Sequence, residues 1–174
     1  MKHLKIGDQA PAFSATLENG SKLDSTSLKG KKWVLYFYPK DLTPGCTTQA
    51  CNIRDNYEVL KQQGIEIYGV SMDSEKLHQR FIEKFDLPFH LIADEDRSII
   101  EAYGVWGTKK FMGKVYDGIH RTTFVINEEN VIIDIIEKPK VKDHAAEIMQ
   151  SFEKNKKIFQ NVNRLRTKHC NFAS

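Results

Sequence analysis

The sequence predicts one α/β domain built on a mixed central β-sheet flanked by helices. A length of 174 residues suits one domain with a sizeable core, and a composition of 40% hydrophobic and 28% charged residues is ordinary for a globular protein. Short apolar runs alternate with segments of helical period, in the order strand–helix–strand–helix and then hairpin–helix. That order requires both parallel and antiparallel strand pairing, hence a mixed sheet.

The chain is predicted to open with a hairpin and a buried strand. Residues 12–24 form the hairpin, in which Asn19 and Gly20 supply the positive φ angles of a tight turn. Residues 31–39 (KKWVLYFYP) form an aromatic-rich strand. Its continuous hydrophobicity indicates that both of its faces are buried.

Two helices and a second strand are expected next. Residues 46–64 carry apolar or small side chains at helical spacing and end at Gly64, which is a helix stop signal. Residues 65–73 predict a strand, and residues 74–86 predict a helix capped by Ser74.

The second half of the sequence predicts a short helix, a hairpin and a closing helix. The short helix falls in residues 93–105, where the acidic run 94–96 complements the helix dipole. Residues 121–137 form a hairpin around a Glu-Glu-Asn turn, and residues 142–158 form the last helix.

We divide the chain into a domain of residues 1–158 and a basic tail of residues 159–174. Three of the 26 basic residues and no acidic residue lie in the tail, so the other 158 residues carry 23 basic and 23 acidic side chains. A neutral body does not have the basic surface that nucleic-acid binding needs. The role of the tail, which contains Cys170, is unknown, and a solvated terminus is the simplest expectation.

The sequence favours a cytoplasmic location. The N-terminus has no apolar segment of the kind found in a secretory signal, and the run Trp33 to Tyr38 is far too short to cross a bilayer. Three cysteines are too few for a disulfide scaffold. We therefore expect no membrane association and reduced cysteines. For the oligomeric state, on which these observations do not bear, we expect a monomer or a weak homodimer.

Several motifs for phosphate or metal binding fail on inspection. Residues 107–114 (GTKKFMGK) resemble a phosphate-binding loop, but five residues separate the glycines where four are needed, and Val115 replaces the Mg²⁺-binding Ser or Thr. The six histidines are scattered singly. We expect no metal and no cofactor.

Cys46 is the strongest candidate for chemistry. It falls in the first turn of a predicted helix, where free backbone N–H groups and the helix dipole favour thiolate over thiol. Thr43 can bring its hydroxyl close to the sulfur, and Pro39 and Pro44 stiffen the loop. The plainer interpretation of Cys46, a small buried apolar residue, remains open on this observation alone.

The pattern P-x-x-x-T-x-x-C, formed by Pro39, Thr43 and Cys46, resembles the active-site signature of the peroxiredoxins. A second cysteine five positions on, Cys51, makes it similar to the bacterioferritin comigratory protein branch, also called the peroxiredoxin Q type. The similarity runs over residues 4–155 and includes the stretch that leads to Arg121. It implies a thioredoxin-like fold with an N-terminal β-hairpin extension.

The resemblance also implies a role for each residue. Cys46 would be the peroxidatic cysteine, which reduces hydrogen peroxide and organic hydroperoxides and becomes a sulfenic acid. The substrate would be bound by Pro39, Thr43, the backbone N–H groups of Gly45 and Cys46, and Arg121, which holds a fixed positive charge near the thiolate. Arg121 in a surface ion pair is the structural alternative.

Cys51 would be the resolving cysteine, which forms an intramolecular disulfide with Cys46 that thioredoxin or a similar dithiol reduces. Its alternative is a residue packed in the core. Tyr38, Trp106 and Phe111 belong either to the substrate pocket or to the core. Two other functions stay open: a thiol–disulfide oxidoreductase, against which the missing C-x-x-C argues, and a non-enzymatic holdase or binding scaffold.

Overall fold

The computed structural model describes the backbone from residue 3 to residue 170 and side chains as far as residue 165. The strands are β1 (Ser14–Thr16), β2 (Lys22–Asp24), β3 (Lys32–Phe37), β4 (Ile65–Ser71), β5 (His90–Ala93), β6 (Trp106–Phe111), β7 (Lys114–Ile119), β8 (Thr122–Ile126) and β9 (Ile132–Glu137). The helices are the 3₁₀ turn η1 (Ser25–Leu28), α1 (Pro44–Asp55), α2 (Tyr57–Gln62), α3 (Glu75–Phe85), α4 (Ser98–Ala102) and α5 (His144–Cys170).

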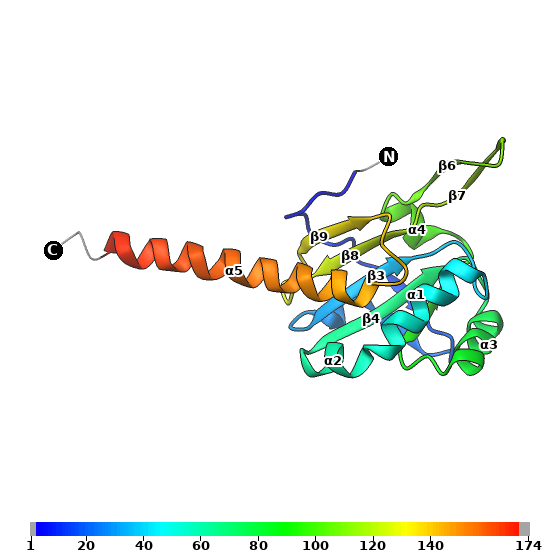
Figure 1. Cartoon of the computed structure of the whole chain (residues 1–174), viewed down its shortest axis with the longest axis horizontal. Helices are drawn as coiled ribbons and strands as arrows, with labels where there is room; N and C mark the ends of the chain where they lie inside the picture. The colour runs from blue at the N-terminus through cyan, green and yellow to red at the C-terminus, as the bar shows by residue number, and fades with distance from the viewer. Residues whose placement is uncertain (1–2, 171–174) are drawn as a thin grey trace.

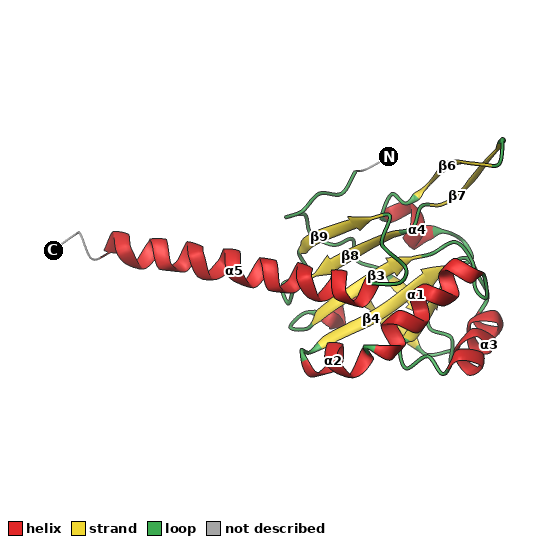
Figure 2. Ribbon diagram, in the orientation of Figure 1, coloured by secondary structure: helices red, strands yellow, loops and turns green. Residues whose placement is uncertain are grey.

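The centre of the molecule is a five-stranded sheet in the order β5-β4-β3-β8-β9. Strand β3 pairs in parallel with β4, and β4 pairs in parallel with β5, whereas β3 with β8 and β8 with β9 are antiparallel. Figure 2 shows this sheet with helices packed against it. The predicted mixed sheet is confirmed, and β3 is its middle strand.

Strand β3 is buried on both faces, as its continuous hydrophobicity predicted. Val34 and Tyr36 point into a core shared with α1, α2, α3 and α5. Leu35 and Phe37 point into a second core on the opposite face, which the N-terminal segment and α4 close. Burial of each large apolar side chain contributes about 1.5–3 kcal/mol, so β3 is a rigid base for the loop that follows it.

The N-terminal hairpin is confirmed, but its turn differs from the prediction. Strands β1 and β2 pair antiparallel around a loop in which Leu17 N–H donates to Ser21 O at 2.9 Å. Gly20 has a φ of +80°, while Asn19 is not among the described residues with positive φ. A longer loop that ends in one left-handed glycine therefore replaces the two-residue turn.

The predicted helix over residues 46–64 is two helices that meet at Asn56. This residue has φ −110° and ψ 9°, outside the helical region, and its side-chain Nδ2 donates to Asn52 O at 2.9 Å. An asparagine side chain that takes a backbone carbonyl in this way competes with the helix ladder. The break separates α1, which carries both cysteines of the predicted site, from α2.

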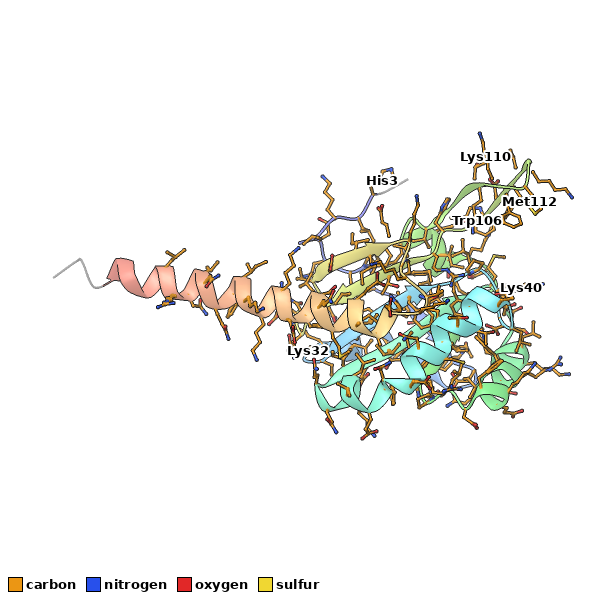
Figure 3. The ribbon with its side chains drawn as sticks, in the orientation of Figure 1. His3, Lys32, Lys40, Trp106, Lys110 and Met112 are labelled. Carbon is orange, nitrogen blue, oxygen red and sulfur yellow. The ribbon has the colours of Figure 1, made fainter. Side chains whose placement is uncertain are left out.

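The structure contains three strands that the sequence pattern did not predict. Strand β5 is only four residues long, and β6 and β7 form a separate hairpin whose turn places Met112 and Gly113 at positive φ. The hairpin projects from the body, with Lys110 and Met112 near its tip (Figure 3). Its sequence shows no apolar alternation because it packs on a core only at its base, where Trp106 pairs with Ile119.

Two helices differ in length from the prediction. Helix α4 begins only at Ser98, and the acidic residue Asp94 caps it from outside by accepting the N–H groups of Ile99 and Ile100. Helix α5 was expected to end at residue 158, but it continues to Cys170.

The outer part of α5 leaves the body, as Figure 1 shows. From residue 153 to residue 165 no side chain is buried. Ile158, Phe159 and Val162 are 53%, 67% and 43% exposed. These three apolar residues have the spacing of one helix face. This pattern was not recognised in the sequence because the domain boundary was placed between residues 158 and 159.

Candidate active site

Cys46 lies at the carboxyl end of the central strand, in the first turn of α1. Thr43 is the N-cap of the helix and Pro44 begins it, a position where proline costs no hydrogen bond. The first helical bond of α1 runs from Thr47 N–H to Thr43 O at 2.9 Å. The N–H groups of Gly45 and Cys46 precede that bond, so they remain available to a ligand. The predicted placement of the cysteine at a helix start is confirmed.

Arg121 contacts the sulfur of Cys46 directly. It immediately precedes β8, which pairs antiparallel with β3, so the topology brings it to the end of β3. Its Nη2 is 3.3 Å from Cys46 Sγ, and its Nη1 donates to Gln49 Oε1 at 2.5 Å. A Cβ atom on residue 45 would lie 3.3 Å from Arg121 Nη2, so Gly45 leaves room for the guanidinium.

Gln49 belongs to the site, although sequence reasoning did not include it. It is completely buried, and its Nε2 has no partner among the described residues. It follows Cys46 by three positions on a helix, a spacing that places two side chains on one face. This spacing was the signal that would have identified it.

The Thr43 hydroxyl is half-buried and donates to Lys40 O at 2.9 Å. Its hydrogen is therefore used within the loop, and its lone pairs are left to accept a hydrogen bond. Pro39 is also half-buried and continues β3 into the loop. Figure 3 shows Lys40 beside the start of α1.

Cys51 is also in α1 but does not share the position of Cys46. Cys46 is 2% exposed, whereas Cys51 is half-buried beside a shallow surface depression, and both are free thiols. Five helical residues correspond to a rotation of about 500° and a rise of about 7.5 Å, so the two Cα atoms are roughly 8–9 Å apart. A disulfide needs less than about 7 Å.

The electrostatic surroundings of Cys46 include two further side chains. Burial, followed by repulsion from Arg121, lowers the pKa of Lys109, while Cys46 acts in the opposite direction. Burial, followed by the negative charges of Asp41 and Cys46, raises the pKa of Tyr36 well above its usual range. Tyr36 is therefore a neutral phenol under working conditions.

The sequence did not decide whether three aromatic residues belong to the substrate pocket or to the core, and the structure places each of them in a different environment. Tyr38 is buried in the same apolar cluster as Cys46. Trp106 packs partly against the opposite core, with the Arg97 guanidinium 4.5 Å from its ring. Phe111 is 65% exposed on the β6–β7 hairpin and belongs to neither.

A cavity of about 550 Å³ reaches Arg121, with Tyr103, Phe124 and Ile135 among its lining residues. Phe124 and Ile135 belong to the core on the face of the sheet opposite α1. Cys46 does not line the cavity itself, but Arg121, which contacts its sulfur, does. Within residues 3–165, no group of three or more His, Cys, Asp or Glu side chains is arranged to hold a metal ion. None of the described helices is long and apolar enough to span a membrane.

The family model of the AhpC/TSA family matches residues 6–135, which is most of the chain. The chain belongs to the AhpC/TSA family. A putative peroxiredoxin bcp of Haemophilus influenzae is 48% identical over 144 residues, covering 83% of this chain and 93% of the relative.

Two solved structures support the same assignment at the level of the fold. A mutant of the Xylella fastidiosa PrxQ superposes with a TM-score of 0.82 at 29% identity, covering 89% of this chain and 99% of the other. The Xanthomonas campestris bacterioferritin comigratory protein superposes with a TM-score of 0.77 at 32% identity, covering 82% and 91%. The AhpC/TSA protein described here is thus a peroxiredoxin of the Bcp or peroxiredoxin Q type with a thioredoxin-like fold, and a thiol-dependent peroxidase.

Proposed function

We propose that this peroxiredoxin reduces hydrogen peroxide and organic hydroperoxides with Cys46 as the attacking thiol. The observation that carries the proposal is the contact of 3.3 Å between Arg121 Nη2 and Cys46 Sγ at the start of α1. A permanent cation and a helix N-terminus both stabilise a thiolate relative to a thiol. The Xanthomonas campestris relative is associated with alkyl peroxide reduction, which supports organic hydroperoxides as substrates.

The first step is a two-electron oxidation of sulfur. The Cys46 thiolate attacks one oxygen of ROOH, the S–O bond forms as the O–O bond breaks, and the departing RO⁻ takes up a proton to leave as ROH. The products are ROH and a Cys46 sulfenic acid. Negative charge moves from sulfur to the leaving oxygen, so donors that face both oxygens lower the barrier.

The groups around Cys46 can supply these donors. The backbone N–H groups of Gly45 and Cys46 and the guanidinium of Arg121 donate to the peroxide oxygens. Thr43, whose hydroxyl hydrogen is held by Lys40 O, accepts a hydrogen bond from the O–H of the hydroperoxide. Gln49 holds the second arm of the guanidinium, which fixes the orientation of the first. Pro39 shapes the start of the pocket.

The second step regenerates the enzyme. The Cys51 thiol attacks the Cys46 sulfenic acid, an S–S bond forms, and water leaves. A dithiol protein such as thioredoxin then reduces the disulfide by exchange, being itself oxidised. A reducing compartment such as the cytoplasm would supply that reductant.

Rapid-mixing kinetics with single-cysteine variants test this assignment. We expect Cys51→Ser to complete one fast turnover with hydrogen peroxide, and Cys46→Ser to complete none. Steady turnover coupled to thioredoxin, its reductase and NADPH should require both cysteines. A first turnover that survives in Cys46→Ser but is lost in Cys51→Ser would reverse the two roles. Disulfide reduction without any peroxide consumption would instead indicate a thiol–disulfide oxidoreductase.

A further inference from the structure

A fully buried polar network lies at the base of the active-site loop, outside α1. His78 Nδ1 is 2.7 Å from Asp41 Oδ2, and the Tyr38 hydroxyl donates to Asp41 Oδ1 at 2.6 Å. His78 Nε2 is 3.0 Å from Ile92 O. The His78 and Asp41 side chains are 0% and 2% exposed. A buried carboxylate and imidazole are costly to place in a core, so their presence needs an explanation.

Hydrogen-bond chemistry fixes most of the protons in this network. A backbone carbonyl can only accept, so His78 Nε2 carries a hydrogen that it donates to Ile92 O. The contact between Nδ1 and the carboxylate then needs one proton between the two atoms. With that proton in place, both oxygens of Asp41 and both ring nitrogens of His78 are satisfied. Such a completely satisfied network stiffens the segment that contains it.

Asp41 is also held through its backbone. Its N–H donates to Asp73 Oδ2 at 2.8 Å, and the same oxygen accepts the Ser71 hydroxyl at 2.7 Å. The loop residue is thereby fixed to the end of β4 and to the short turn that joins β4 to α3. No residue of the network belongs to α1.

The residue after Asp41 has a strained backbone. Leu42 has a φ of +61° and is 37% exposed. A left-handed leucine costs about 1–3 kcal/mol and persists only where its surroundings enforce it. Here the fixed Asp41 stands on one side and the N-cap of α1, Thr43, on the other. The strain therefore lies at the junction between the anchored loop and the helix.

We propose that Asp41 and His78 are positioning residues of the peroxidase site, forming a fixed pivot from which α1 unwinds on oxidation and to which it returns on reduction. The idea rests on the proposed function, because unwinding is required by the Cys46–Cys51 disulfide. The pivot keeps residues 38–41 in place in both redox states. Movement begins at Leu42, whose strain is relieved when the helix opens.

Hydrogen exchange measured by mass spectrometry tests the pivot in the full chain. Diamide, a thiol oxidant, forms the disulfide without peroxide, so the measurement stays informative even if the peroxidase assignment fails. We expect peptides that report on residues 38–41 to exchange equally slowly in the reduced and disulfide forms, while α1 exchanges faster only in the latter. Faster exchange of residues 38–41 on oxidation would overturn the proposal.

Variants separate positioning from general stability. Asp41→Ala should lose protection of residues 38–41 in both forms and slow the first peroxide turnover at least about tenfold. Asp41→Asn should stay within about twofold of the wild type, because an amide can accept from Tyr38 and donate to a neutral His78 Nδ1. Asp94→Ala, which removes another buried carboxylate, is the matched control and should change neither readout.

Two results would contradict the proposal. One is a first peroxide turnover in Asp41→Ala that is as fast as in the wild type. The other is an Asp41→Asn protein that folds but lacks the wild-type protection of residues 38–41. Should Asp41→Ala not fold, the comparison of the two redox forms in the wild type and in Asp41→Asn decides the question alone.

Discussion

Formation of the Cys46–Cys51 disulfide is expected to unwind the first two turns of α1. Both cysteines lie within the helix, which spans Pro44–Asp55. In the intact helix their Cα atoms are roughly 8–9 Å apart and about 140° apart around the axis. A disulfide requires a separation below about 7 Å and converging Cβ atoms. The bond therefore cannot form until the turns that contain both residues open.

The expected signal is large because helical amides lose their acceptors. If the bonds across residues 47–52 contribute about 2.7 kcal/mol of protection in the reduced form, their loss accelerates hydrogen exchange about a hundredfold. The assay compares exchange across residues 43–60 in reduced and peroxide-treated protein. Peroxide-treated Cys51→Ser, which stops before the disulfide, should remain protected. Equal protection in both wild-type forms, with the disulfide confirmed by mass spectrometry, would refute the reasoning.

Three further predictions concern charge, the tail and pH. Arg121→Ala should slow peroxide reduction about 10- to 100-fold, since a charged hydrogen bond to the sulfur is lost. An unchanged rate in a folded variant would make the arginine structural. Deleting residues 159–174 should leave turnover intact, and a large drop would mean that the tail takes part in resolution or docks the reductant. The hydrogen bond to Glu18 raises the pKa of His90 in the folded protein. This half-exposed pair adds about 0.2–1 kcal/mol to the free energy of unfolding. That contribution is fully present below pH ~6.5, the pKa of a free histidine, and is lost as pH rises through the raised pKa. Chemical denaturation should show His90→Gln to be destabilised at pH 6 and hardly at pH 8, and an equal loss at both would contradict the assignment.

Most of the scaffold that positions the site was readable from local sequence pattern. The continuous hydrophobicity of β3 gave a strand buried on both faces, and the Ser74 cap predicted α3, whose Ser74 hydroxyl accepts Leu77 N–H at 3.3 Å. These features depend on residues close together in the chain. Hairpin β6–β7 was missed because no core imposes alternation on it, and the break at Asn56 was missed because one side-chain hydrogen bond determines it.

The candidate site likewise has one part that local sequence predicts and other parts that depend on contacts between distant residues. The position of Cys46 in the first turn of α1 follows from neighbouring residues. Arg121 and Cys46 are 75 positions apart in the sequence, and their contact depends on β8 pairing with β3, so only the family resemblance indicated it. The network around Asp41 and His78 joins a loop, a helix and a strand end, and no local pattern reports such a combination.

The outer part of α5 has a consequence for how the protein melts. Helix formation is limited by nucleation, and the turns from His144 to Phe152 are already held by the core. The exposed turns that follow can therefore form by propagation alone, at close to zero net free energy per residue. On heating they should shorten gradually from the C-terminal end while the domain stays folded. Circular dichroism would then record a sloping loss of helix below a single cooperative transition, two processes in one 27-residue helix.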